Sequence, residues 1–184
     1  MIDRREQSRE SLAGSLLLAH PVLQDPNFRR TMVLMSAHGQ EGAMGVVLNR
    51  PTGKRLGEIQ GEFALGPLAA APVFSGGPVQ VDRLILVAWQ SRNDGFQLHF
   101  GIDPARAGQL MSEDHTKVRA YLGHSGWSAG QLEEELKRST WVVTDAPVDL
   151  FDQVGDERLW REALAKQGDR WRLLADEPDD PEQN

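Results

Sequence analysis

The sequence contains no cysteine, which excludes disulfides, thiolate nucleophiles and cysteine-ligated zinc or iron–sulfur sites. It also lacks an apolar run that approaches the roughly 20 residues needed to cross a bilayer. Residues 1–11 carry three arginines and three acids, without the apolar segment that a signal peptide requires. Together these absences predict a soluble cytoplasmic protein with no membrane association.

Positive charge is also scarce. The formal net charge is −7, and five of the excess negative charges fall in residues 176–184, which contain no base. We expect a flexible arm over residues 1–11, a single domain over 12–175 and a disordered acidic tail over 176–184. The acidic balance and the lack of a helix-turn-helix pattern argue against direct DNA recognition.

Apolar runs predict a sheet of strands that are mostly linked by hairpins. Strands are expected within residues 12–19, 31–38, 43–49, 73–74 and 84–89, with an edge strand at 97–100. Helices are expected at residues 56–63, at 105–111 after the N-cap Asp103 and Pro104, within 128–138, and at 157–167, with a helical turn at 148–151. This order of elements indicates an α+β domain.

The densest local signals lie in residues 118–144, which predict a strand, a turn, a short helix and a second strand. The turn is expected at Gly123-His124-Ser125-Gly126, where two glycines interrupt the alternation of the strand. Ser128 is then the predicted N-cap of the helix, and Gln131 is placed to complete a capping box.

Three separated motifs resemble those of the AlgH/YqgE family of small bacterial proteins. They are the run of residues 118–144, GAMGVVLNRP at 42–51 and SGGPVQVDR at 75–83. The resemblance spans roughly residues 12–174 and implies a largely antiparallel, partly barrel-like sheet surrounded by short helices. The family has no established biochemical activity. One namesake is described as a regulator of alginate synthesis genes, which implies a place in regulation.

The stretch Gly123-His124-Ser125-Gly126-Trp127 invites comparison with the nucleophile elbow G-x-S-x-G of serine hydrolases. The match fails at its last position, because that strained turn requires a small residue where a tryptophan stands here. The structural interpretation is that Trp127 enters the core and packs on Leu132 as a hydrophobic staple. No catalytic residue is assigned on this basis.

The histidines show no spacing typical of metal ligands, because no pair forms H-x-H, H-x-x-x-H or H-E-x-x-H. They are His20, His38, His99, His115 and His124. His38 and His124 each fall at the end of a predicted strand and could meet at one edge of the sheet. We predict neither a metal nor a cofactor.

A local excess of positive charge lies between residues 26 and 55. Its five bases, opposed there only by Glu41, are Arg29, Arg30, Arg50, Lys54 and Arg55. If the hairpin gathers them, they form a candidate site for a phosphate, a nucleic-acid backbone or an acidic partner. The alternative is that they are solvated charges paired with nearby carboxylates.

A second candidate site consists of polar residues near the glycine motifs, several of which match positions of the family. They are Asn49, Arg50, Arg83, His124, Gln131 and Glu134. If they line one groove, the arginines and Asn49 could orient a ligand, with Gln131 or Glu134 as acceptors. The alternative is that each residue caps a turn or makes a salt bridge.

The sequence therefore favours a non-catalytic cytosolic protein that binds a partner protein or a small ligand, with any link to transcription being indirect. One alternative is an enzyme of unassigned class that uses two or more of His38, His124, Ser125 and Glu134. Another is a weak binder of phosphate or nucleic-acid backbone through the basic residues. The sequence does not indicate an oligomeric state.

Overall fold

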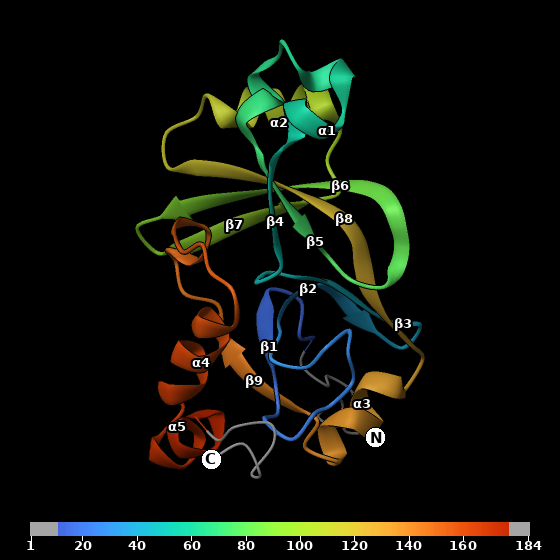
Figure 1. Cartoon of the computed structure of the whole chain (residues 1–184), viewed down its shortest axis with the longest axis vertical. Helices are drawn as coiled ribbons and strands as arrows, with labels where there is room; N and C mark the ends of the chain where they lie inside the picture. The colour runs from blue at the N-terminus through green and yellow to red at the C-terminus, as the bar shows by residue number, and fades with distance from the viewer. Residues whose placement is uncertain (1–10, 177–184) are drawn as a thin grey trace, which may run out of the picture.

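The computed structural model describes residues 11–176, in which nine strands form one sheet bordered by short helices (Figure 1). The strands are β1 (Ser15–Ala19), β2 (Met32–Gly39), β3 (Gly42–Val47), β4 (Pro51–Arg55), β5 (Pro72–Ser75), β6 (Val79–Arg92), β7 (Gly95–Phe100), β8 (Thr116–Ser128) and β9 (Trp141–Asp145). The helices are α1 (Leu56–Ile59), α2 (Pro104–Met111), α3 (Gln131–Lys137), α4 (Glu157–Ala165) and α5 (Asp169–Asp176), with the 3-10 turns η1 (Gly61–Phe63), η2 (Pro67–Ala70) and η3 (Leu150–Asp152). The predicted α+β class is confirmed.

β8 is the strand that joins the two halves of the sheet. Its residues 116–124 pair with β6, and residues 120–122 pair in parallel with β5. Residues 125–128 pair with β3. We call β4–β5–β8–β6–β7 the upper sheet and β8–β3–β2–β1–β9 the lower sheet, as they are drawn in Figure 1. All of these pairings except β5–β8 are antiparallel, as predicted, and the nine-strand sheet does not close.

The predicted turn at residues 123–126 is wrong, because β8 continues through them. Strands on both sides provide partners for this backbone: His124 lies opposite Val79 and Ser125 lies opposite Gly45. Gly123 has a φ of 72°, which bends the strand where it leaves one sheet for the other without reversing it. The glycine that suggested a turn therefore marks a bend.

The predicted helix that follows is present, but its start is displaced. Gly130, with a φ of 77°, is the N-cap of α3, so the assignment of Ser128 as the cap is wrong. The side-chain oxygen of Gln131 still accepts a hydrogen bond from the Ser128 backbone N–H at 3.0 Å. Trp127 and Leu132 lie in the same core cluster, which confirms that this tryptophan enters the core.

Two other helical predictions are corrected. The helix expected over 56–63 breaks at Gln60, whose extended backbone (φ −130°) separates α1 from η1. The helix over 157–167 is not the last one, because α5 follows it after Gly168, which has a φ of 131°. The sequence of α5, DRWRLLAD, is short and offers only one buried residue, Ala175, so no apolar face as clear as that of α4 indicated a helix.

The predicted N-terminal arm and acidic tail lie almost entirely outside the described residues. Of these segments the structure describes Ser11, whose hydroxyl donates to the His38 carbonyl at 3.1 Å, and Asp176, the last residue of α5. In residues 11–176 no helix is long and apolar enough to cross a membrane.

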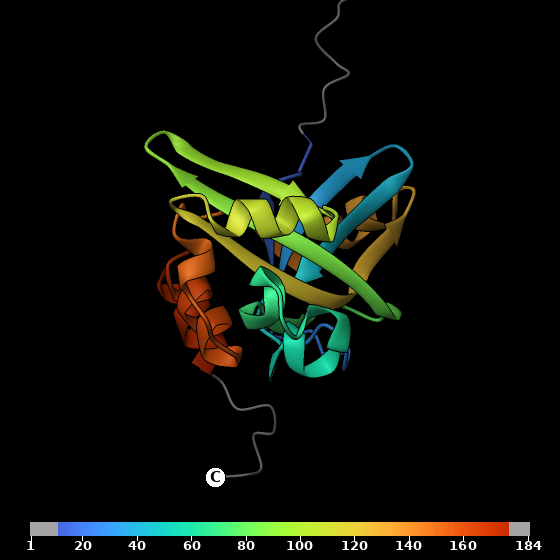
Figure 2. The ribbon, with the colours of Figure 1, turned by 90° about the horizontal axis from the view of Figure 1, so that it is seen from above.

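The core of residues 11–176 consists of three clusters that follow the layers of the fold. One lies beneath α1, η2 and α2, against the upper sheet, and includes Leu56, Leu68 and Leu110. Another lies beneath α3, on the lower sheet. The largest connects both sheets to η3, α4 and α5, which stack along one side of the molecule when it is seen from above (Figure 2).

The bend in β8 coincides with a close approach of backbones. A Cβ added at Gly76 would overlap the carbonyl oxygen of Gly123, and one added at Gly77 would overlap that of His124. Gly76 donates to the Leu122 carbonyl at 2.8 Å and accepts from the Val47 N–H at 2.9 Å. These contacts hold β5, β8 and the end of β3 together, so the glycines at the crossing serve close packing.

We expect Gly76→Ala to lower the free energy of unfolding by at least about 2 kcal/mol, because the added methyl group meets a fixed backbone oxygen. Gly39→Ala is the matched control, since no atom lies within 4 Å of its added Cβ. It should change stability by less than about 0.5 kcal/mol. Urea denaturation of both variants measures the difference, and equal effects would contradict the close approach.

Candidate functional site

Asn49 is buried, with 2% of its surface exposed, and its amide is occupied by the fold. The side-chain oxygen accepts from the Met32 N–H at 2.9 Å, and the side-chain nitrogen donates to the carbonyls of Arg30 and Asp156 at 2.9 and 3.2 Å. These bonds attach β2, the loop before it and the start of α4 to one side chain. Asn49 therefore has a structural role, which was the alternative to ligand binding.

The five bases of the predicted anion site fall into two groups. Arg50 donates to the Arg29 carbonyl at 3.0 Å, and Arg30 pairs with Glu157 at 2.9 Å. Lys54 and Arg55 lie at the other end of β4, where Arg55 donates to the Ala70 carbonyl at 2.9 Å. The register of β4 with β5 places Pro51 opposite Phe74 and Arg55 opposite Pro72, so the two groups lie at opposite ends of this strand pair. The backbone therefore separates the two groups.

Arg83 and His124 lie close together beside the β8 crossing. The pairing of β6 with β8 is interrupted between Val79 and Leu84, so the intervening residues form a bulge in which all side chains are exposed. Arg83 donates to the side chain of Gln80 at 3.1 Å, and Gln80 has a positive φ of 50°. Burial, and secondly the charge of Arg83, lower the pKa of His124.

Gln131 and Glu134 are engaged in interactions within the α3 region. Gln131 donates to Glu135 at 3.0 Å, in addition to its bond with the Ser128 N–H. Glu134 contacts Lys137 at 2.6 Å, and this hydrogen bond lowers the pKa of its exposed carboxyl group. Their observed contacts are those of a capped, salt-bridged surface helix.

The candidate acid–base residues have separate partners. His38 accepts from the Leu12 N–H at 3.1 Å on Nδ1, and its Nε2 lies 3.1 Å from Glu133. Ser125 is buried and donates to the Gly76 carbonyl at 3.1 Å. Within residues 11–176 no hydrogen bond joins any two of His38, His124, Ser125 and Glu134, and no three potential metal ligands are grouped.

His38 and His124 do not meet at one edge of the sheet. His38 pairs with Ala43, and Ala43 pairs with Trp127, which is three residues beyond His124 on β8. Two strand spacings and three residues correspond to roughly 14 Å between their Cα atoms. The expectation that they share an edge is therefore wrong.

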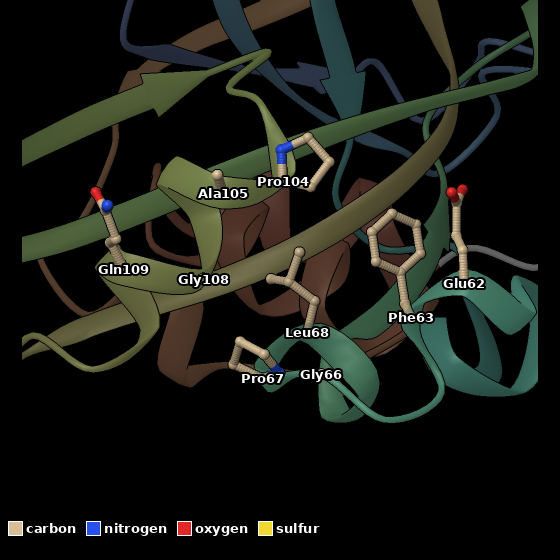
Figure 3. Close-up of a pocket in the computed structure, with 9 residues that line it drawn as sticks. All are labelled: Glu62, Phe63, Gly66, Pro67, Leu68, Pro104, Ala105, Gly108 and Gln109. Carbon is tan, nitrogen blue, oxygen red and sulfur yellow. The ribbon is translucent and has the colours of Figure 1, made fainter.

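A separate concave surface lies on the helical cap above the upper sheet (Figure 3). We call it the cap groove. It has a volume of about 490 Å³, with η1, η2 and their connection on one side and one face of α2 on the other. Its lining is Glu62, Phe63, Gly66, Pro67, Leu68, Pro104, Ala105, Gly108 and Gln109. Most of these side chains are apolar or small.

Local sequence signals explain the walls of the cap groove. Asp103 accepts from the Arg106 N–H at 2.9 Å as the N-cap of α2, and Pro104 follows it as the first helical residue. Leu110 is fully buried on the inner face of the same helix. The small residues Ala105 and Gly108 are left on the groove side. Glu62 is the one ionisable residue in the lining, so the surface suits apolar contact better than proton transfer.

Sequence reasoning missed this groove. It predicted the helix at residues 105–111 but not the 3-10 turn η2 on the other side of the groove. The two segments are more than thirty residues apart, however, and no local pattern indicates that they are neighbours. Only the structure marks this region, by the fully exposed side chain of Leu65 between η1 and η2.

Comparisons with known proteins agree on one family. A family model described as AlgH-like matches residues 16–172. A UPF0301 protein of Streptomyces coelicolor is 37% identical over 190 residues, with 95% of this chain and 96% of the relative covered. A UPF0301 protein of Chlorobium limicola is 33% identical, with 91% and 93% covered. These matches confirm the resemblance drawn from the three motifs.

Solved structures show the same fold. The solution structure of the AlgH protein from Pseudomonas aeruginosa is 30% identical and has a TM-score of 0.66, with 96% of this chain and 99% of that chain covered. The crystal structure of protein DIP2367 from Corynebacterium diphtheriae is 22% identical, with a TM-score of 0.70 and coverage of 92% and 94%.

We expect NMR to show that the His124 ring titrates below 6.5, and Arg83→Gln to raise that midpoint. The rise should be partial, because burial is the larger cause and remains. The folded protein binds this proton less tightly than the unfolded chain, so His124 contributes stability above pH 6.5 that is lost as the pH falls below that value. Arg92→Gln, at the far end of β6, is the control. An unchanged midpoint in Arg83→Gln would exclude their proximity.

Proposed function

The chain belongs to the AlgH-like family, and we propose that it is a cytosolic binding protein that holds an apolar segment of another protein in the cap groove, without catalysing a reaction. The observation that supports this proposal most directly is the groove itself, which is open and mostly apolar, has a volume of about 490 Å³ and lies beside an exposed leucine. Surfaces of this kind on a single chain mark sites of protein or ligand association.

Leu65 is the natural anchor of such an interaction. Its side chain is fully exposed, whereas Leu68, three residues later, is buried beneath the same segment. Burying a leucine side chain completely contributes about 1.5–3 kcal/mol. A partner that covers Leu65 and fills the groove would therefore gain a hydrophobic centre of the kind that dominates protein interfaces.

The partner in this proposal is a different polypeptide. α5, where the described chain ends, lies at the opposite end of the molecule from α1 and α2 (Figure 1). The lining offers one carboxylate and no base, so it selects a segment that presents apolar side chains and little negative charge. Any effect on transcription would be indirect and would act through this bound protein.

The alternatives have less support. An enzyme using the histidines, Ser125 and Glu134 would need two of them in one pocket, and each of these side chains other than His124 is hydrogen-bonded elsewhere. A phosphate-backbone binder would need the bases on one surface, and β4 holds them in two groups.

Ala105→Glu places a carboxylate in the cap groove and should weaken binding of the partner at least about tenfold, because an unpaired charge must then be desolvated. The fold should be preserved, since Ala105 is exposed in the first turn of α2, where an acid is favourable. A photoreactive amino acid at position 65 identifies the cross-linked protein in cells, and isothermal titration with that purified protein measures the affinity.

Ala13→Glu is the matched control, because it makes the same change at an exposed alanine outside the groove. It should leave both the cross-link and the affinity unchanged. The proposal fails if position 65 gives no cross-linked protein, or if the partner binds Ala105→Glu as tightly as the wild-type chain.

A further inference from the structure

A second cavity lies on the other side of the molecule from the cap groove lining, between α4 and the lower sheet. It has a volume of about 120 Å³. Its apolar wall includes Leu16 of β1, Met32 of β2, Leu150 of η3, and Leu159 and Ala163 of α4. We call it the α4 cavity. No residue of the cap groove contributes to it, so it is a separate candidate site.

The walls of the α4 cavity are fixed by contacts that do not depend on an occupant. The indole of Trp160 donates to the Ala19 carbonyl at 2.9 Å and holds α4 against β1. The buried guanidinium of Arg119 donates to the carbonyls of Phe151 and Gln153 at 3.1 and 2.7 Å and holds the opposite wall. The cavity is therefore preformed, which lowers the entropic cost of binding.

Polar groups surround the mouth of the cavity. Thr144 accepts from the side chain of Gln167 at 3.1 Å. Asp145, Glu162 and Lys166 also line the cavity, and within the described part of the chain none of the three takes part in an ion pair. Two carboxylates against one ammonium group give the mouth a net negative charge.

These features select a particular class of molecule. The volume corresponds to about four water molecules at ~30 Å³ each, so the apolar body that it accepts has only a few carbon atoms. The acidic mouth favours a positively charged head group, and an ammonium group has three donors for the carboxylates and the threonine hydroxyl. A carboxylate head would meet two like charges.

We propose that the α4 cavity binds a small primary amine with a short branched aliphatic body. The body lies against Leu16, Met32 and Ala163, and the ammonium group is held between Asp145 and Glu162. The site does not depend on partner binding at the cap groove.

Three probes of one shape test the head group: 3-methylbutylamine, 3-methylbutan-1-ol and 3-methylbutanoate. Isothermal titration and the NMR shift of the Ala163 methyl group measure binding. The amine should bind about tenfold or more tightly than the alcohol, because a charged hydrogen bond is lost with the ammonium group. The carboxylate should bind more weakly still.

Two variants and a matched control test the location. Ala163→Leu fills the cavity and should abolish amine binding, whereas Ala165→Leu, on the same helix outside the lining, should not. Glu162→Gln should weaken the amine severalfold and leave the alcohol unchanged. This second variant decides the case if Ala163→Leu does not fold.

The proposal is overturned if no probe binds the wild-type chain, or if the three probes bind equally. An increase in melting temperature of Ala163→Leu without binding of any probe to the wild type would identify a dry packing defect and would also overturn it. Ala105→Glu should bind the amine normally, so failure of the cap groove proposal and failure of this one are distinguishable.

Discussion

The structure depends on one steric constraint, the backbone crossing between Gly76-Gly77 and the bend of β8 at Gly123. Side chains larger than hydrogen do not fit at this crossing, and the Gly76 carbonyl accepts hydrogen bonds from both Val47 and Ser125. The two sheets meet there through a single strand. The crossing therefore determines how the upper sheet, which supports the cap groove, is oriented relative to the lower sheet, which supports the α4 cavity.

A second constraint is the burial of Arg119, which is 2% exposed. Its guanidinium lies between the rings of Phe74 and Phe151, 4.7 and 4.4 Å from their centroids, and donates to two carbonyls of the η3 region. Within residues 11–176 no ion pair compensates its charge, so the rings and carbonyls stabilise it. This arrangement ties β8 to the segment that leads into α4, and a lysine could not reproduce its planar contacts.

The sequence predicted the elements well where the signals are local. The hairpin of β2 and β3, the capped helix α2 and the edge strand β7 follow from turn, cap and alternation patterns. The errors arose where tertiary contacts override those patterns, as at residues 123–126, where β3 and β6 convert an expected turn into a bend. The functional sites were harder to predict from the sequence, because most of the polar residues near the motifs form hydrogen bonds with local backbone groups. The concave surfaces are instead built from segments that are distant in the chain.

This distribution explains why the family motifs have not revealed a function. In the motif residues at 75–83 and 123–127, Gly76, Gly77 and Gly123 meet the steric requirement of the crossing. In the motif at 42–51, Asn49 meets a hydrogen-bonding requirement of the fold, because it joins β2 to the loop before it and to the start of α4. Within the motifs, the exposed residues include those of the β6 bulge around Arg83, whose charge contributes to the lowered pKa of His124. Recognition in the remainder of the chain is expected at surfaces such as the cap groove, where shape and apolar area matter more than the identity of any single residue. A motif search therefore finds the residues that form the crossing. The binding surfaces are found only in the folded structure, because they are built from segments that are distant in the chain.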